Sequence, residues 1–178
     1  MSLWLRFLDW LTARLGIGRR AVPREPVSLR PIAVVRNGVR QPRPDGWASV
    51  ISDVIVRDDL AEQLDGIEGY SHVIVVFAFD RVPESERKAR VRPRGDARIP
   101  EQGVLATRSQ LRPNPVGVSV ARLLRRRRNI LRVQGLDAID GTPVLDIKPY
   151  FPNYDAVPDA AIPEWARALA SAPPPAPR

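Results

Sequence analysis

Short runs in which apolar and polar residues alternate recur through the middle of this chain. Alternation with a period of two places the apolar side chains on one face of a strand, and β-branched residues favour extended backbone. Glycine, proline and aspartate, which favour turns, bound these runs. The pattern predicts a mainly β fold, a single small β-barrel of about seven short strands. The expected strands are residues 32–35, 49–56, 73–79, 103–107, 116–124, 130–133 and 143–147.

Helical patterns are confined to the two ends and the periphery of the chain. Near the amino end, apolar residues at helical spacing predict one amphipathic helix, which covers an apolar patch or, alternatively, rests on a membrane surface. Arg6 and Asp9 interrupt its apolar run, which argues against both a signal peptide and a membrane span. Short helices outside the barrel are predicted at 58–64 and 163–169. We expect a helix and linker at 1–26, the barrel domain at 27–170 and a proline-rich disordered tail at 171–178.

Composition adds looser limits. The 178 residues suit one domain, and with no cysteine and one histidine the sequence predicts an organic cofactor rather than a metal. The net charge of +8 favours a polyanionic partner such as nucleic acid. The charge argument is weakened because Lys88 and Lys148 are the only lysines, which indicates a compositional preference for arginine.

Two stretches concentrate polar side chains between prolines and glycines: residues 103–119 (GVLATRSQLRPNPVGVS) and 135–150 (GLDAIDGTPVLDIKPY). In the first, two prolines restrict the backbone so that Arg112 and Asn114 leave a stiff, extended loop. In the second, Asp140-Gly141 predicts a tight hairpin turn that pairs the run 130–139 with the run 144–147. Asp140 and Gly141 therefore serve the turn rather than catalysis in this interpretation.

Together with residues 64–72 (LDGIEGYSH), these stretches resemble the TrmO family, also called TsaA-like or YaeB-like. The resemblance covers roughly residues 31–155. It implies an S-adenosylmethionine-dependent methyltransferase built on a small β-barrel and working as a cytoplasmic homodimer. It further implies a tRNA substrate, methylated on N6 of the N6-threonylcarbamoyladenosine beside the anticodon.

The methyl donor has a carboxylate, an ammonium and two ribose hydroxyls, so its site needs an arginine and a carboxylate acceptor. Arg108 and Asp137 are the candidates for these roles. The resemblance carries further cofactor contacts onto three segments. They are Gly135, Leu136 and Asp137 beside Arg108, then Asp80 and Arg81, and finally Asp45, Gly46 and Trp47.

Substrate contacts are expected from basic, amide and aromatic side chains. Arginines position phosphates, and aromatic rings stack on extruded bases. For the arginine run at 125–128 the alternative is a solvated face, and for Lys148 it is a structural ion pair with Asp146. No catalytic residue is assigned, and the candidates for that role are Asn114 and Tyr150. The predicted substrate-binding set is Arg112, Asn114, Lys148, Tyr150, Tyr154, Arg125, Arg126, Arg127 and Arg128.

Two other functions remain open at this point. One is a methyltransferase acting on another RNA or a small molecule, because many relatives carry a further carboxyl-terminal domain. The other is a non-catalytic basic barrel that binds RNA. The spacing of Arg108, Arg112, Asn114 and Asp137 favours an enzyme over this second alternative.

Overall fold

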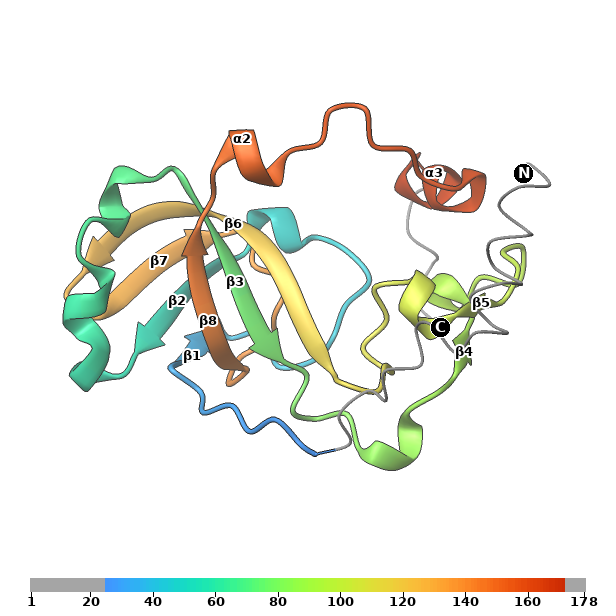
Figure 1. Cartoon of the computed structure of the whole chain (residues 1–178), viewed down its shortest axis with the longest axis horizontal. Helices are drawn as coiled ribbons and strands as arrows, with labels where there is room; N and C mark the ends of the chain where they lie inside the picture. Colours follow the sequence, from blue (N-terminus) through green and yellow to red (C-terminus); the bar gives the residue numbers. More distant parts are fainter. Residues whose placement is uncertain (1–24, 172–178) are drawn as a thin grey trace, which may run out of the picture.

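The structure, a computed structural model, describes residues 25–171. Six antiparallel strands close into a barrel in the order β1-β2-β7-β6-β3-β8 (Figure 1). This confirms the prediction of a mainly β, small-barrel fold. The barrel strands are β1 (Ala33–Arg36), β2 (Ile51–Val56), β3 (His72–Ala78), β6 (Val116–Arg127), β7 (Ile130–Gln134) and β8 (Pro143–Pro149).

Alternation along the strands fills the barrel interior. Every second residue of β3 is buried, and its inward side chains meet those of the neighbouring strands. At Gly117 on β6 the ring of Phe77 takes the space of a side chain, since a Cβ there would lie 2.4 Å from a ring carbon. The most deeply buried core residues are Val35, Val54, Val73, Val75, Leu131, Val133, Leu136 and Val144.

The strand predicted at 103–107 is wrong as a barrel strand. Only Gln102–Gly103 (β5) is extended, and it pairs with Arg90–Val91 (β4) in a separate two-stranded sheet. The next residues, Val104–Ala106 (η6), turn into a 3-10 helix because the Val104 carbonyl accepts hydrogen bonds from the Thr107 amide and hydroxyl.

The basic segment at 81–100 forms a small ordered unit of its own. Val91 and Ile99 are buried in it. Besides β4, the segment holds the 3-10 turns Glu84–Glu86 (η4) and Pro93–Gly95 (η5). The Arg92 guanidinium donates to the Ile99 carbonyl at 2.6 Å, which ties the two parts of this excursion together.

The hairpin predicted at Asp140-Gly141 is wrong. β7 lies between β2 and β6, whereas β8 lies between β1 and β3, so the two strands do not pair. Asp140 instead accepts a hydrogen bond from the Asn37 amide at 3.0 Å, which ties residues 135–142 across the end of the barrel to β1. The backbone amides of Asn37 and, to a lesser extent, Gly38 donate to this carboxylate and lower the pKa of Asp140.

The tight two-residue hairpin lies elsewhere, at Arg128-Asn129 between β6 and β7. Arg127 pairs with Ile130, and Arg128 adopts a φ of 55° to turn the chain. Asn129 donates to the Val56 carbonyl, which fixes the turn against β2. The hairpin therefore lacks the glycine that marks most turns of this type.

Short helices surround the barrel. The helices predicted at 58–64 and 163–169 are confirmed, the first as a 3-10 helix. The amino-terminal helix and the end of the tail fall on residues 1–24 and 172–178, outside the described residues. Within residues 25–171, no helix is long and apolar enough to cross a membrane. The remaining elements are η1 (Trp47–Ser49), η2 (Asp58–Leu64), η3 (Ile67–Gly69), α2 (Pro152–Asp155) and α3 (Glu164–Ser171).

Candidate functional site

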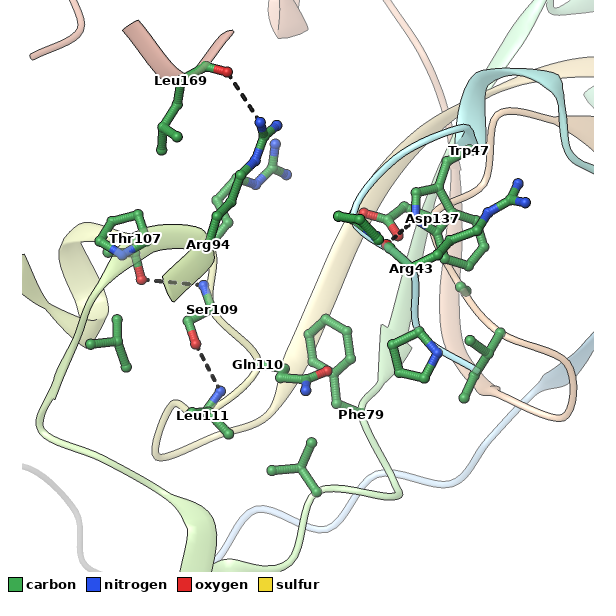
Figure 2. A pocket seen from close by; sticks show the side chains of 18 of the residues that line it. Arg43, Trp47, Phe79, Arg94, Thr107, Ser109, Gln110, Leu111, Asp137 and Leu169 are labelled. Carbon is green, nitrogen blue, oxygen red and sulfur yellow. Dashed lines mark hydrogen bonds between the residues drawn. The ribbon is translucent and has the colours of Figure 1, made fainter. Parts of the chain in front are cut away.

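A broad cleft of about 1390 Å³ opens at one end of the barrel. Phe77 and Phe79, from the end of β3, and Thr142, from the turn before β8, form its floor on the barrel side. The segments around β4 and η6, together with α3, form the facing wall. Figure 2 shows Asp137 and Trp47 on one side of this space and Arg94 and Leu169 on the other.

Arg108 and Asp137, predicted as cofactor residues, both line this cleft. Arg108 follows η6, and its guanidinium donates to the Val118 carbonyl of β6 at 2.9 Å. Asp137 follows β7, and its backbone amide donates to the hydroxyl of Ser119, also on β6, at 3.3 Å. Because β6 holds both segments, a cation and a carboxylate 29 positions apart in the chain face one site.

The environment of Asp137 weakens its ionisation. Partial burial raises the pKa of its carboxyl above the ordinary value of 3.8, and the positive charge of Arg108 acts in the opposite direction. Perturbed acids in a cleft are frequent at functional sites. A second cationic or hydrogen-bond-donating partner would therefore stabilise the charged form of Asp137.

The other predicted cofactor segments flank the same cleft. Asp80 and Arg81 line it, and Arg81 donates to the Asp140 carbonyl at 2.8 Å. Trp47 lines it too; its indole donates to the Arg43 carbonyl at 3.1 Å, and the Arg43 guanidinium lies 5.0 Å from the ring centroid. The tryptophan side chain is therefore fixed by its own loop.

Four predicted cofactor residues do not line the cleft. Leu136 is fully buried in the core, so it reaches a ligand only through its backbone. Gly135 and Gly46 have φ values of 87° and 73°, which suit glycine and turn the chain just before Leu136 and Trp47. Asp45 is exposed beside Gly46.

Arg112 and Asn114, predicted as substrate residues, lie outside the lining. Arg112 is half-buried, and its guanidinium donates to the carbonyls of Thr107 and Ser109. It closes the loop that presents Arg108, so its visible role is structural. Asn114 is exposed, and its backbone carbonyl accepts a hydrogen bond from the Val116 amide.

The aromatic and basic candidates lie at the opposite end of the barrel. Antiparallel register places His72 and Arg122 at the far end of the β3–β6 pair from Ala78 and Val116, where the cleft lies. Tyr150 packs against His72 with 6.2 Å between ring centroids, and Tyr154 is 85% exposed. These residues do not line the cleft of their own chain.

The arginine run divides into two kinds of side chain. Arg126 is held by Asp65 at 2.7 Å and Glu68 at 3.3 Å, which makes it a structural ion pair. Arg125, Arg127 and Arg128 are exposed, and none of them forms an ion pair within residues 25–171. Lys148 pairs with Asp146 at 2.7 Å, as its alternative interpretation predicted.

Sequence reasoning missed part of the lining. Arg94 from η5 and Trp165 from α3 both face the cleft. The helical pattern around Trp165 predicted a short helix but not where it packs. Its apolar spacing was the available indication that one face meets the rest of the molecule.

The arrangement offers a cation, a carboxylate and aromatic surfaces around one space. Such a set suits a ligand that is zwitterionic at one end and a flat ring at the other. Within residues 25–171 there is no group of three or more histidine, cysteine or acidic side chains placed to hold a metal.

Comparison with known proteins assigns the chain to a family. Residues 36–156 match the family model described as the tRNA-methyltransferase O N-terminal domain. An S-adenosyl-L-methionine-binding protein of Archaeoglobus fulgidus is 41% identical over 133 residues, which span 72% of this chain and 93% of that protein. The tRNA (adenine(37)-N6)-methyltransferase of Escherichia coli K12 is 42% identical over 108 residues, 57% of this chain and 45% of that protein.

Solved structures agree with the sequence relatives. A crystal structure of TrmO from Pseudomonas aeruginosa superposes with a TM-score of 0.65 at 35% identity, over 86% of this chain and 65% of that one. The chain therefore spans slightly less than two thirds of that structure. With more than half of its length matched by the family model, this chain belongs to the tRNA-methyltransferase O (TrmO) family.

Proposed function

We propose that this protein transfers a methyl group from S-adenosylmethionine to N6 of a tRNA adenine next to the anticodon, in the form of N6-threonylcarbamoyladenosine. The carrying observation is that Arg108 and Asp137 meet at one cleft of a chain that belongs to the TrmO family. The relatives' names supply the cofactor and the tRNA adenine. Because the proposed acceptor is a tRNA, we also propose that the protein works in the cytoplasm.

The cleft residues fit the methyl donor. The Arg108 guanidinium suits a carboxylate, and the Asp137 carboxylate suits an ammonium or ribose hydroxyls. Trp47 and Phe79 add flat apolar surface for an adenine ring. A cationic or hydrogen-bond-donating ligand would counteract the burial that raises the pKa of Asp137, because it stabilises the charged carboxylate.

The reaction requires little covalent help from the protein. When bound, S-adenosylmethionine supplies an electrophilic methyl group on a positively charged sulfur. The Arg108 guanidinium and the Asp137 backbone are each hydrogen-bonded to β6. These two residues are therefore fixed in place before the reaction and need not reorganise during it. A cleft with walls on two sides would hold donor and acceptor in a fixed orientation, and such positioning accounts for much of the acceleration in reactions of this kind.

We also propose that the protein is a homodimer. Val118 and Val120 on the outer face of β6 are 47% and 48% exposed, and their cross-strand partners on β3 are Val76 and Ile74. An exposed apolar face of this kind suits isologous pairing with a second copy of the chain. Light scattering on a Val118→Asp, Val120→Asp variant should show monomers; an unchanged dimer would place the interface elsewhere.

The decisive experiment uses labelled S-adenosylmethionine and two tRNA pools, one carrying threonylcarbamoyladenosine and one lacking it. Nucleoside mass spectrometry should show methyl gain in the modified pool alone, and an Arg108→Ala variant should show much less. Gain in neither pool, with cofactor binding intact by calorimetry, would exclude tRNA and leave another acceptor. Loss of both binding and transfer would leave a non-catalytic RNA-binding barrel.

A further inference from the structure

The facing wall of the cleft contains a segment that the family match does not cover. The matched residues end at 156, whereas α3 spans Glu164–Ser171. Trp165 on this helix is half-buried and lines the cleft, together with Ile162 and Leu169. The segment after residue 156 therefore adds an aromatic side chain to the site from outside the matched residues.

Contacts with another segment hold α3 at the cleft. The Arg94 guanidinium donates to the Leu169 carbonyl at 3.2 Å, near the carboxyl end of the helix, as Figure 2 shows. A cation at that end is also favourable to the helix dipole. Within η5, Arg94 has a φ of 52°, an uncommon backbone conformation for a residue other than glycine. α3 is thus held as a wall of the cleft.

The cleft is larger than one small ligand requires. Its volume of about 1390 Å³ exceeds the roughly 300–1,000 Å³ of ordinary small-molecule pockets. The proposed donor groups, Arg108 and Asp137, are anchored on the barrel side through β6. The space in front of Trp165 and Leu105 remains for a second group with apolar surface. The side chain of Leu105 is 75% exposed.

Charge indicates the nature of that second group. Six arginines line the cleft against three acidic residues, so its rim is positive. A positive groove with an accessible indole has the composition of single-stranded nucleic-acid sites, where bases stack on aromatic rings while cations follow the phosphates. The six are Arg40, Arg43, Arg81, Arg92, Arg94 and Arg108.

We propose that Trp165 is the stacking platform for the acceptor adenine of the RNA, and that α3 forms the acceptor side of the cleft while β6 anchors the cofactor side. This inference rests on the proposed function, because it names the subsite that receives the RNA. Its central residue, Trp165, lies beyond the segment that the family model matches.

The test compares wild-type protein with Trp165→Ala and Trp165→Phe, and with Val157→Ala as a control on the exposed linker. The probes are an anticodon stem-loop RNA carrying threonylcarbamoyladenosine and the same RNA with an abasic site at that position. Trp165→Ala should weaken binding of the intact RNA by about 5- to 150-fold, which corresponds to the usual range for base–aromatic stacking. Trp165→Phe should retain most of the affinity, and Trp165→Ala should have no effect on the abasic RNA.

Calorimetry with S-adenosylhomocysteine separates the two sources of a purine ring. We expect unchanged cofactor affinity in Trp165→Ala; a loss confined to the cofactor would assign the indole to the cofactor's adenine and overturn the proposal. Equal losses on intact and abasic RNA, or no loss on either, would also overturn it. Wild-type protein that binds RNA but transfers no methyl would refute the proposed function alone. Thermal melting of each variant checks that the barrel remains folded.

Discussion

The two ends of the barrel both carry arginines, but these arginines have different partners. At the cleft end, Arg81 and Arg108 donate to backbone carbonyls of Asp140 and Val118, which holds them at the wall of the site. At the hairpin end, Arg126 is neutralised by two acidic side chains, and its neighbours Arg125 and Arg127 are exposed. Local density of charge is therefore a poor guide to a binding site, whereas a cation anchored by neutral groups keeps its charge available.

Aromatic residues show the same contrast. Trp47 and Phe79 line the cleft, and Phe79 packs edge-on against Phe77 with 5.3 Å between ring centroids. At the far end, Tyr70, Phe151 and Tyr154 pack against one another on the surface around α2. The far cluster has aromatic surface without an enclosing cleft, so within one chain it lacks the confinement that orients a reacting group.

The sharpest test of the difference is to remove one anchored arginine. Arg108→Ala should weaken S-adenosylmethionine binding by about 1.5–3 kcal/mol, the usual range for a charge-assisted hydrogen bond, or roughly 10- to 150-fold in Kd. Arg125→Ala, a matched change at the hairpin end, should leave that Kd unchanged in calorimetry. Equal effects of the two variants would contradict the assignment of the cofactor to the cleft.

Packing behind the cleft offers the next largest effect. Gly117→Ala would bring a Cβ to 2.4 Å from the Phe77 ring, which must then move. We expect a loss of about 1–3 kcal/mol in the free energy of unfolding, as for other overpacked cores, measured by urea denaturation. Gly69→Ala, where no atom lies within 4 Å of the new Cβ, is the control. Similar stability of the two variants would show that Phe77 has room to adjust.

The hairpin end is tested through salt. Replacing Arg125, Arg127 and Arg128 with Gln, while Arg126 is kept for its ion pairs, should weaken tRNA binding. It should also lower the slope of log K against log salt by about 2–3 if all three contact phosphates. Cofactor affinity should not change. An unaltered slope in filter-binding titrations would identify these arginines as a solvated surface.

The smallest expected effect is a pH dependence that originates at Asp137. Its pKa is raised by partial burial, so the folded protein favours the protonated form and the free energy of unfolding should rise as pH falls through that pKa. Cofactor affinity should fall over the same pH range, because protonation removes the carboxylate charge. Calorimetry from neutral pH downward should show this loss beginning above pH 3.8. Asp137→Asn should abolish both trends; a fall in affinity that persists in this variant would have another origin.

Most of the fold was predictable from the chain. Alternating β-branched runs predicted all six barrel strands, since burial of one face imposes a period of two. The errors fell where local chemistry allows more than one structure. Asp140-Gly141 suits a hairpin, yet contacts with Asn37, 103 positions away, use the same aspartate to join two parts of the barrel end.

The candidate site was predictable in part. Arg108 and Asp137 were identified from their residue types and from the family resemblance, and they line one cleft. The resemblance assigned Leu136 with them, but its side chain is fully buried in the core, so only its backbone can reach the cleft. Trp165 was missed because no local pattern indicates which distant surface a short helix will meet.

By itself, the sequence determined the period of the strands, the polar residues between its prolines and glycines, and the motifs that mark the TrmO family, because these depend on neighbours along the chain. Only the tertiary structure decided which cations are neutralised, which aromatic rings share a cleft, and that α3 faces Asp137 across it. The physical reason is that charge pairing, burial and enclosure depend on distances between side chains, and barrel closure brings together residues that the chain keeps far apart.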